Sequence, residues 1–172
     1  MKTMTKFSLF AALLAGATSP ALAQTSSTTT TGTTTILQPV TIAQTNALAF
    51  GSIVRPTAGS STITIGTGAD TVTTTGSALV AGGIKSRARY TVSGEGAQVV
   101  SVTMPATFNL SKVGATDLPV TLTRNPAGNL TLSGTAGTTG TASLDVGGSF
   151  PITSTTVTGD YSGTFTVSVA YN

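Results

Sequence analysis

Apolar side chains alternate with small polar ones along most of the chain, and this two-residue period constrains the fold more than any other feature. Successive side chains of a β-strand point to opposite faces, so alternation gathers the apolar groups on one face. Threonine and serine fill most of the opposite positions and suit a solvated face. The residues expected to form the core are the pairs Ile63 and Ile65, Tyr90 and Val92, Val100 and Val102, Val120 and Leu122, Leu130 and Leu132, and Leu144 and Val146, together with the series Phe165, Val167, Val169 and Tyr171.

Turn-forming residues divide the alternating sequence into many short segments. Glycine, proline, asparagine or aspartate stands at the breaks, as in Gly82-Gly83, Gly94-Glu95-Gly96 and Gly147-Gly148. Many short strands at this spacing predict an all-β sandwich or barrel with almost no helix, and we favour an antiparallel sandwich. The expected strands span residues 36–44, 47–54, 61–66, 71–75, 87–93, 99–104, 119–124, 129–133, 141–146, 150–154 and 161–171.

The first 23 residues have the layout of a secretory signal peptide. Lys2 and Lys6 form a basic start, residues 7–16 form a short apolar run, and Ala21-Leu22-Ala23 provides a cleavage site of the A-x-A type. The apolar run is too short for a stable membrane anchor. We therefore expect cleavage before Gln24 and export of a chain that has no transmembrane segment after cleavage.

The charge of the exported chain is almost balanced. Cleavage leaves 149 of the 172 residues and removes two of the eight basic residues but none of the five acidic ones, so the net charge falls from +3 to +1. The one loose basic cluster, Lys85, Arg87 and Arg89, lacks the interleaved aromatic side chains that stack on bases. We therefore expect no nucleic acid partner.

Histidine and cysteine, two residue types that often carry catalysis or bind metals, are absent from the sequence. The chain has no histidine and no cysteine, so it lacks a histidine general base, a thiolate nucleophile and the usual transition-metal ligands. The acids lie in or near expected turns and lack the spacing of an EF-hand loop; they are Asp70, Glu95, Asp117, Asp145 and Asp160. We expect no enzyme activity, no cofactor and no metal site.

A threonine-rich extension, residues 24–35, lies between the expected signal peptide (residues 1–23) and the expected β-sandwich domain (residues 36–172). Eight of its twelve residues are threonine and two are serine, so it buries too little apolar surface to become ordered alone. Threonine is β-branched, however, and favours an extended strand once a partner edge is present. Two interpretations stay open: a donor strand for another subunit, or a flexible linker that is a candidate for glycosylation.

The last fourteen residues, from Gly159 to Asn172, predict a strand with one large apolar face. Small or polar residues separate the members of this face, which are Phe165, Val167, Val169 and Tyr171. Such a strand tends to associate with other apolar surfaces through one face. Alternation alone also fits the closing strand of an ordinary sandwich whose apolar face meets its own core.

Two segments together resemble a known class of proteins. The first is Ala47-Leu48-Ala49-Phe50-Gly51-Ser52-Ile53. The second is the ending Gly-Asp-Tyr-Ser-Gly-Thr-Phe-Thr-Val-Ser-Val-Ala-Tyr, in which Gly159 stands fourteenth from the end and Tyr171 is penultimate. They resemble a family of uncharacterised secreted proteobacterial β domains. That family is similar to subunits of the Mat/Ecp common pilus and to other chaperone-usher pilins.

This resemblance implies an immunoglobulin-like sandwich that lacks its last strand. A periplasmic chaperone would add a strand beside the terminal strand, and the extension of the next copy would replace it at an outer-membrane usher. After transit through the periplasm, the finished fimbrium would serve adhesion at the cell surface or outside the cell. The residues implied to contact the chaperone or a neighbouring copy are Gly159, Phe165, Val167, Val169 and Tyr171. The candidate donor residues are Thr28, Thr30, Gly32, Thr34 and Ile36.

The extension departs from a typical donor strand. Residues 24–35 offer only threonine methyl groups, and Pro39 opposes a longer donor because proline cannot donate to a ladder. The sequence predicts a structural subunit that polymerises by donor-strand exchange. The alternative is a monomeric secreted or periplasmic β-sandwich that binds a carbohydrate or an envelope partner and already contains its own last strand.

Overall fold

The computed structural model describes residues 25–172, so the expected signal peptide and its cleavage site lie outside the described residues. Thr35–Asn172 form a compact unit, which holds all the regular secondary structure of the described residues. Residues 25–34 are exposed and belong to no strand or helix.

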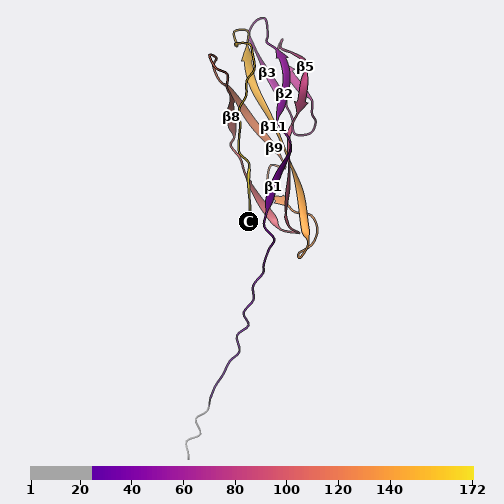
Figure 1. Ribbon diagram of the computed structural model, residues 1–172, viewed down its shortest axis with the longest axis vertical. Helices are drawn as coiled ribbons and strands as arrows, with labels where there is room; N and C mark the ends of the chain where they lie inside the picture. Colours follow the sequence, from indigo (N-terminus) through magenta and orange to yellow (C-terminus); the bar gives the residue numbers. More distant parts are fainter. Residues whose placement is uncertain (1–24) are drawn as a thin grey trace, which may run out of the picture. The chain divides into compact units, whose positions relative to one another are not determined.

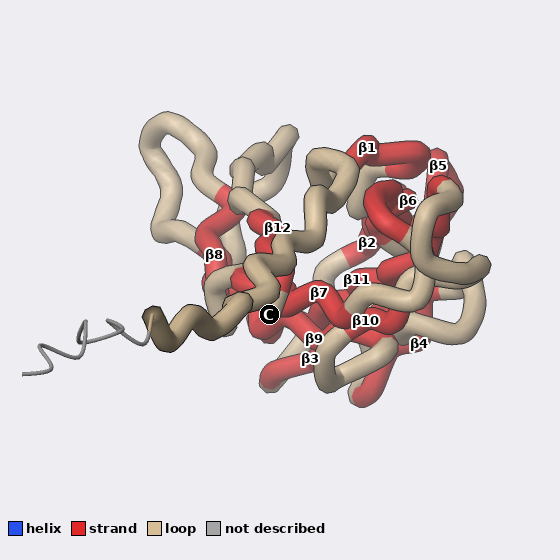
Figure 2. The backbone as a smooth tube through the Cα atoms, turned by 90° about the horizontal axis from the view of Figure 1, so that it is seen from below, coloured by secondary structure: helices blue, strands red, loops and turns tan. Residues whose placement is uncertain are grey.

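The compact unit consists of strands joined by turns and loops, and residues 25–172 contain no helix (Figure 2). All strand pairings are antiparallel. This confirms the expected all-β class. The strands are β1 (Thr41–Asn46), β2 (Ala49–Val54), β3 (Ser60–Ile65), β4 (Val72–Thr75), β5 (Leu79–Ser86), β6 (Ala88–Glu95), β7 (Val99–Thr103), β8 (Thr107–Leu110), β9 (Leu118–Asn125), β10 (Leu130–Thr131), β11 (Thr139–Thr153) and β12 (Ser168–Tyr171).

Curled antiparallel sheets enclose the core and form a β-sandwich (Figure 1). The largest sheet has the order β1-β6-β11-β3-β4, and β9 pairs with the other edge of β11 and carries β8. A three-stranded sheet has the order β10-β7-β12, and β2 pairs with β5. The predicted sandwich architecture is therefore confirmed.

The central strand β11 contains two adjacent glycines at the point where three other strands meet it. Its first half pairs with β6, its second half with β3, and its opposite edge with β9 around Gly147 and Gly148. A Cβ on Gly147 would fall onto the carbonyl oxygen of Ile65, and one on Gly148 would lie 2.9 Å from Val120 Cγ1. The prediction of a break at Gly147-Gly148 is therefore wrong, because glycine here permits close approach of neighbouring strands.

Three other strand predictions differ from the structure. Gly82-Gly83 predict a turn, but both lie within β5, where the pairing with β2 shifts register and the φ of Gly83 is +79°. No strand is predicted at β8, a four-residue segment just after Pro105. The first strand begins at Thr41 instead of residue 36, after Pro39 has removed one ladder donor.

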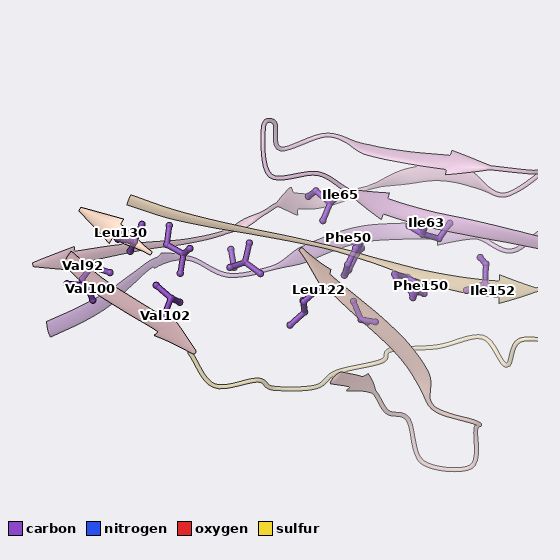
Figure 3. Packing of buried hydrophobic residues seen from close by; sticks show 14 of the residues in the cluster. Phe50, Ile63, Ile65, Val92, Val100, Val102, Leu122, Leu130, Phe150 and Ile152 are labelled. Atoms are coloured by element: carbon purple, nitrogen blue, oxygen red, sulfur yellow. The ribbon is translucent and has the colours of Figure 1, made fainter. Parts of the chain in front are cut away.

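The buried core confirms most of the predicted alternation. Tyr90 and the four apolar residues of the series from Phe165 to Tyr171 are only half-buried, whereas the other predicted core residues are all buried. Figure 3 shows the buried side chains in an extended row between the strands, with Val100 near one end and Ile152 near the other. The buried members of the predicted pairs are Ile63, Ile65, Val92, Val100, Val102, Val120, Leu122, Leu130, Leu132, Leu144 and Val146.

Candidate functional site

The C-terminal segment, residues 159–172, runs along β7 and β8 but forms a full ladder only with β7. Residues 168–171 form β12, which pairs with β7. Further upstream, Ser162 and Ser111 form one isolated bridge with reciprocal backbone hydrogen bonds of 2.8 and 3.1 Å. The prediction of a continuous strand from residue 161 is therefore wrong. Pro105 separates β7 from β8, so the segment has no continuous strand to pair with.

The side chains of this segment nevertheless keep the two faces that the sequence predicts. Phe165, Val167, Val169 and Tyr171 are half-buried and pack against the core, whereas the residues between them are exposed. The ring centroid of Phe165 lies 5.0 Å from that of Phe108 in β8. The segment is thus held mainly by its apolar face where the ladder is missing.

Both β1 and β12 are edge strands. β1 pairs only with β6, and β12 pairs only with β7. The two strands approach each other, and Figure 1 shows the C-terminus beside β1, but no ladder joins them. Within the part of the chain that the structure describes, the outer edge of β12 therefore has no partner strand.

A cavity of about 610 Å³ opens between the N-terminal strands and the segment that leads to β12. β2 contributes several lining residues, β11 contributes Phe150 and Ile152, and Leu110 and Leu118 come from β8 and β9. Residues 156–161, which follow β11, complete the lining. The rings of Phe50 and Phe150 meet edge to face with centroids 4.9 Å apart. The cavity therefore borders the hydrophobic core directly.

A second cavity of about 250 Å³ adjoins the first, because Leu48, Phe50 and Leu110 line both. Residues 163–165 of the C-terminal segment line it, together with Tyr90. Desolvation by burial raises the pKa of the Tyr90 phenol above its usual value of 10.0. The two cavities form one groove beside the C-terminal segment, which we name the terminal groove.

Polar groups and a glycine form part of the rim of the terminal groove. Arg55 Nη1 donates a hydrogen bond of 2.8 Å to the carbonyl oxygen of Thr156, and the Tyr161 hydroxyl donates one of 2.9 Å to that of Val157. Gly159 has a φ of +130°, which glycine adopts more readily than other residues. Gly159 therefore lies at a bend on the groove rim, nine residues before β12 begins.

The chain just before β1 is anchored to β12 through the Tyr171 hydroxyl. This hydroxyl donates a hydrogen bond of 2.7 Å to the carbonyl oxygen of Gln38 and accepts one of 2.6 Å from the backbone N–H of Glu95. The Gln38 N–H donates to Glu95 Oε2 at 3.3 Å, and Thr139 Oγ1 donates to Gln38 Oε1 at 2.8 Å. Gln38 is therefore fixed to the sandwich by contacts at its backbone and side chain.

Glu95 is the residue of this anchor that sequence reasoning misses. It is expected to be a turn former, yet it is only 4% exposed and also accepts a hydrogen bond from the backbone N–H of Gly137. A Cβ on Gly94 would fall onto the Tyr171 hydroxyl. The sequence signal for this residue is an acid between two glycines, in a chain with few charges. This signal does not identify Gln38 as the hydrogen-bond partner.

The candidate donor residues do not form a strand in the single chain. Thr28, Thr30, Gly32 and Thr34 are exposed, and a Cβ on Gly32 would meet no atom within 4 Å. Ile36 is 88% exposed although it is large and apolar. The structure therefore leaves these side chains accessible to another molecule.

The loose basic cluster of the sequence is largely neutralised by acids. Arg87 Nε lies 2.9 Å from Asp145 Oδ1, and Arg87 Nη1 lies 3.2 Å from Asp70 Oδ1. Arg89 Nη2 lies 3.0 Å from Asp70 Oδ2. Asp145 lies in the middle of β11, so its assignment to a turn is wrong. These four side chains form an ion-pair network instead of a basic surface.

Two other kinds of site are absent from residues 25–172. Residues 25–172 hold no group of three or more His, Cys, Asp or Glu side chains placed to bind a metal ion. Over the same residues, no helix has the length and apolar character needed to cross a membrane.

Comparison with known proteins identifies one family. Residues 40–171 match the family described as a domain of unknown function, DUF4402. Neither a curated protein nor a solved structure gives a significant match. The match covers nearly all of the sandwich, from just before β1 to the last residue of β12. The chain therefore belongs to the DUF4402 family.

Proposed function

We propose that this protein is a structural subunit that polymerises on the bacterial surface by strand addition between copies. In this proposal, the threonine-rich extension of one copy pairs with the outer edge of β12 in the next copy and occupies its terminal groove. The single observation that carries the proposal is an edge strand without a partner, β12, at the end of a segment whose upstream part, residues 156–165, borders an open groove that reaches the core.

The physical reason is that the edge and the groove need the same kind of partner. A free strand edge presents unpaired backbone N–H and C=O groups, which pair readily with another extended chain. The groove along residues 156–165 is lined by apolar side chains, of which Leu48 is half-buried and Phe50 belongs to the core. An added strand satisfies both requirements, because its backbone completes the ladder while alternate side chains enter the groove.

The extension has a suitable length and composition for this role. Twelve residues in extended conformation span roughly 40 Å at about 3.3 Å per residue. Threonine favours strand geometry, and residues 25–34 are exposed and belong to no strand of their own chain. The extension therefore becomes ordered when a second copy provides an edge.

The resemblance to chaperone-usher pilins supplies the rest of the proposal. A free subunit with an open groove would aggregate, so a periplasmic chaperone covers the groove before assembly and an outer-membrane usher directs the exchange. The assembled fimbrium then acts in adhesion. Each of these steps is non-covalent, and the proposed role requires no catalytic residue or cofactor.

Deletion of residues 24–35 tests the donor assignment. The shortened subunit keeps its groove but has no strand to donate, so it should fold and bind chaperone yet form no fibre. When it is produced together with the intact protein, it should shorten the fibres seen by electron microscopy, because each shortened copy ends a chain. If the shortened protein alone forms fibres of normal length, the extension is not the donor.

The alternative function, a monomer that binds a carbohydrate or an envelope partner in the terminal groove, rests on the polar rim that includes Arg55, Asp160 and Tyr161. It predicts that deletion of residues 24–35 leaves both the oligomeric state and the ligand binding unchanged. The same deletion experiment therefore separates the two functions.

A further inference from the structure

We propose, on the basis of the proposed function, that Ile36 of one copy occupies the larger cavity of the next copy, with the incoming extension antiparallel to the C-terminal segment. The inference assigns a direction and a register to a donor that is otherwise almost uniform threonine. It rests on where the extension is anchored, on where the larger cavity lies, and on the distribution of large side chains.

The anchor at Gln38 sets the C-terminal limit of the donor. Gln38 is bound by Tyr171, Glu95 and Thr139, and Val40 already packs against the core. Residues beyond position 37 therefore cannot leave the sandwich without breaking these contacts. Among residues 25–37, the large apolar side chains are Ile36 and Leu37, which are 88% and 37% exposed.

The anchor and the larger cavity lie at opposite ends of the central strand. Thr139 at the start of β11 holds Gln38, while Thr153 at the end of β11 accepts a backbone hydrogen bond of 3.1 Å from Thr156, which lines the larger cavity. A strand of 15 residues spans roughly 50 Å at about 3.3 Å per residue. The extension of a copy therefore starts far from the larger cavity of that same copy.

This separation determines how successive copies meet in a fibre. If two copies met at their anchored ends, the contact would be two-fold and would close as a dimer. An open chain requires the anchored end of one copy to meet the cavity end of the next. The residue that is nearest the donating sandwich, Ile36, then enters at the larger cavity, and residues toward position 25 continue along the groove to β12.

The direction of the donor follows from the same arrangement. The acceptor segment runs from Gly159 at the larger cavity to Tyr171 at the anchored end. The incoming extension runs from residue 25 near β12 to Ile36 at the larger cavity, so the two chains are antiparallel. Every strand pair within the sandwich has this same antiparallel sense.

The side-chain sizes of the donor and the two cavity volumes change in the same order. The cavity volume is about 610 Å³ beside residues 156–161 and about 250 Å³ beside residues 163–165. In the proposed register, the bulky Ile36 enters the larger cavity, and the threonines and Gly32 follow toward the smaller one. Small donor residues then suit the smaller cavity.

Engineered disulfides test the register, and the absence of native cysteine makes every new disulfide interpretable. Ile36→Cys is combined with Val157→Cys at the larger cavity, where Val157 is 44% exposed, or with Val169→Cys on the half-buried face of β12. We expect the Val157 pair to give multimers that survive boiling and collapse to monomer on reduction. Both single-cysteine variants of that pair should lose their multimers on boiling.

Three outcomes have separate meanings. Disulfides in the Val169 pair alone would show the opposite direction and overturn the inference, while polymerisation itself would stand. Fibres without disulfides in either pair would show that Ile36 lies outside the groove, which also overturns the inference. If the unmodified protein forms no multimers, the proposed function fails and the inference fails with it.

A second measurement uses no cysteine. Ile36→Ser removes the apolar side chain from the larger cavity, so the multimers should dissociate at a lower temperature than those of the unmodified protein. Thr28→Ser is the matched control and should leave the dissociation temperature almost unchanged, because position 28 lies toward the smaller cavity. Equal dissociation temperatures for both variants would contradict the assignment of Ile36.

Discussion

The two ends of the sandwich share the central strand β11 but differ in how the C-terminal segment covers them. At the closed end, which contains β7 and β12, the core residues of β7, Val100 and Val102, are 0% and 8% exposed and line neither cavity of the terminal groove. At the open end, beside residues 156–165, Phe50 and Phe150 are buried to a similar degree, at 9% and 6% exposure, but both line the larger cavity. Figure 3 shows Val100 and Phe150 toward opposite ends of the same row of buried side chains.

This difference shows that a ladder, and not only an apolar face, is needed to close the sandwich. At the closed end, β12 pairs with β7 over four residues. At the open end, the same segment makes one isolated bridge, between Ser162 and Ser111, and the groove remains. The open end thus has apolar side chains in place but lacks backbone pairing, which is what an added strand would supply.

The largest effect should come from removing the apolar face of the closed end. Full burial of an apolar side chain contributes about 1.5–3 kcal/mol, of which each half-buried valine supplies a part, and an unpaired carboxylate placed against the core adds a further cost. Changing Val167 and Val169 together to Asp should therefore unfold the domain or lead to its degradation in the periplasm. Circular dichroism and the level of exported protein measure this effect.

The matched control for that double variant lies on the other face of the same segment. Thr166 and Ser168 are both exposed, so changing them together to Asp adds the same charge without entering the core. This control should remain folded. Equal folded fractions for the two double variants would show that Val167 and Val169 do not support the closed end.

A smaller effect should follow from loosening the anchor at the closed end. Tyr171→Phe removes the hydroxyl that joins Gln38 to Glu95, and losing hydrogen bonds to partly buried groups costs about 1–3 kcal/mol. Hydrogen exchange at residues 38–42 should become faster. Tyr161→Phe is the control because its hydroxyl binds an exposed carbonyl at the open end. Unchanged exchange in the Tyr171→Phe variant would show that the anchor has no role.

The smallest effect should be a loss of stability at high pH from Tyr90, which lies between the two ends. Because burial raises the pKa of its phenol above 10.0, folding favours the neutral form. Its contribution is complete below pH 10 and is lost as the pH rises through the pKa of the folded state. Tyr90→Phe should reduce the slope of stability against pH above 10 in urea unfolding. A slope identical to that of the unmodified protein would contradict this assignment.

The core was predictable from sequence because its signal is local. Alternation with period two reports directly which face of a strand is buried, and pairs such as Ile63 and Ile65 confirm it. The strand break predicted at Gly147-Gly148 was not correct, because a Gly-Gly dipeptide occurs both in turns and where neighbouring strands approach closely. Only the position of distant residues such as Ile65 and Val120 decides between the two uses.

The candidate site was predictable only in part. Alternation identifies the half-buried face that includes Phe165 and Val169, but the terminal groove depends on where the ladder stops. The anchor at Gln38 is still harder to predict from the sequence, because Gln38 and Glu95 are 57 positions apart and Gln38 and Tyr171 are 133 positions apart. No periodic pattern in one sequence reports contacts between such distant polar residues.

The central claim is that the open end is completed by a strand from another copy. Its most direct test is electrophoresis of protein taken from the cell surface, with and without boiling in detergent. Because separation must expose the whole groove at once, the subunit contact should be kinetically stable. We predict a ladder of multimers in the cold sample and a single band near 15 kDa, a mass of about 0.1 kDa for each residue of the exported chain, after boiling. A single band under both conditions, from protein that is a monodisperse monomer without any chaperone, would contradict the account.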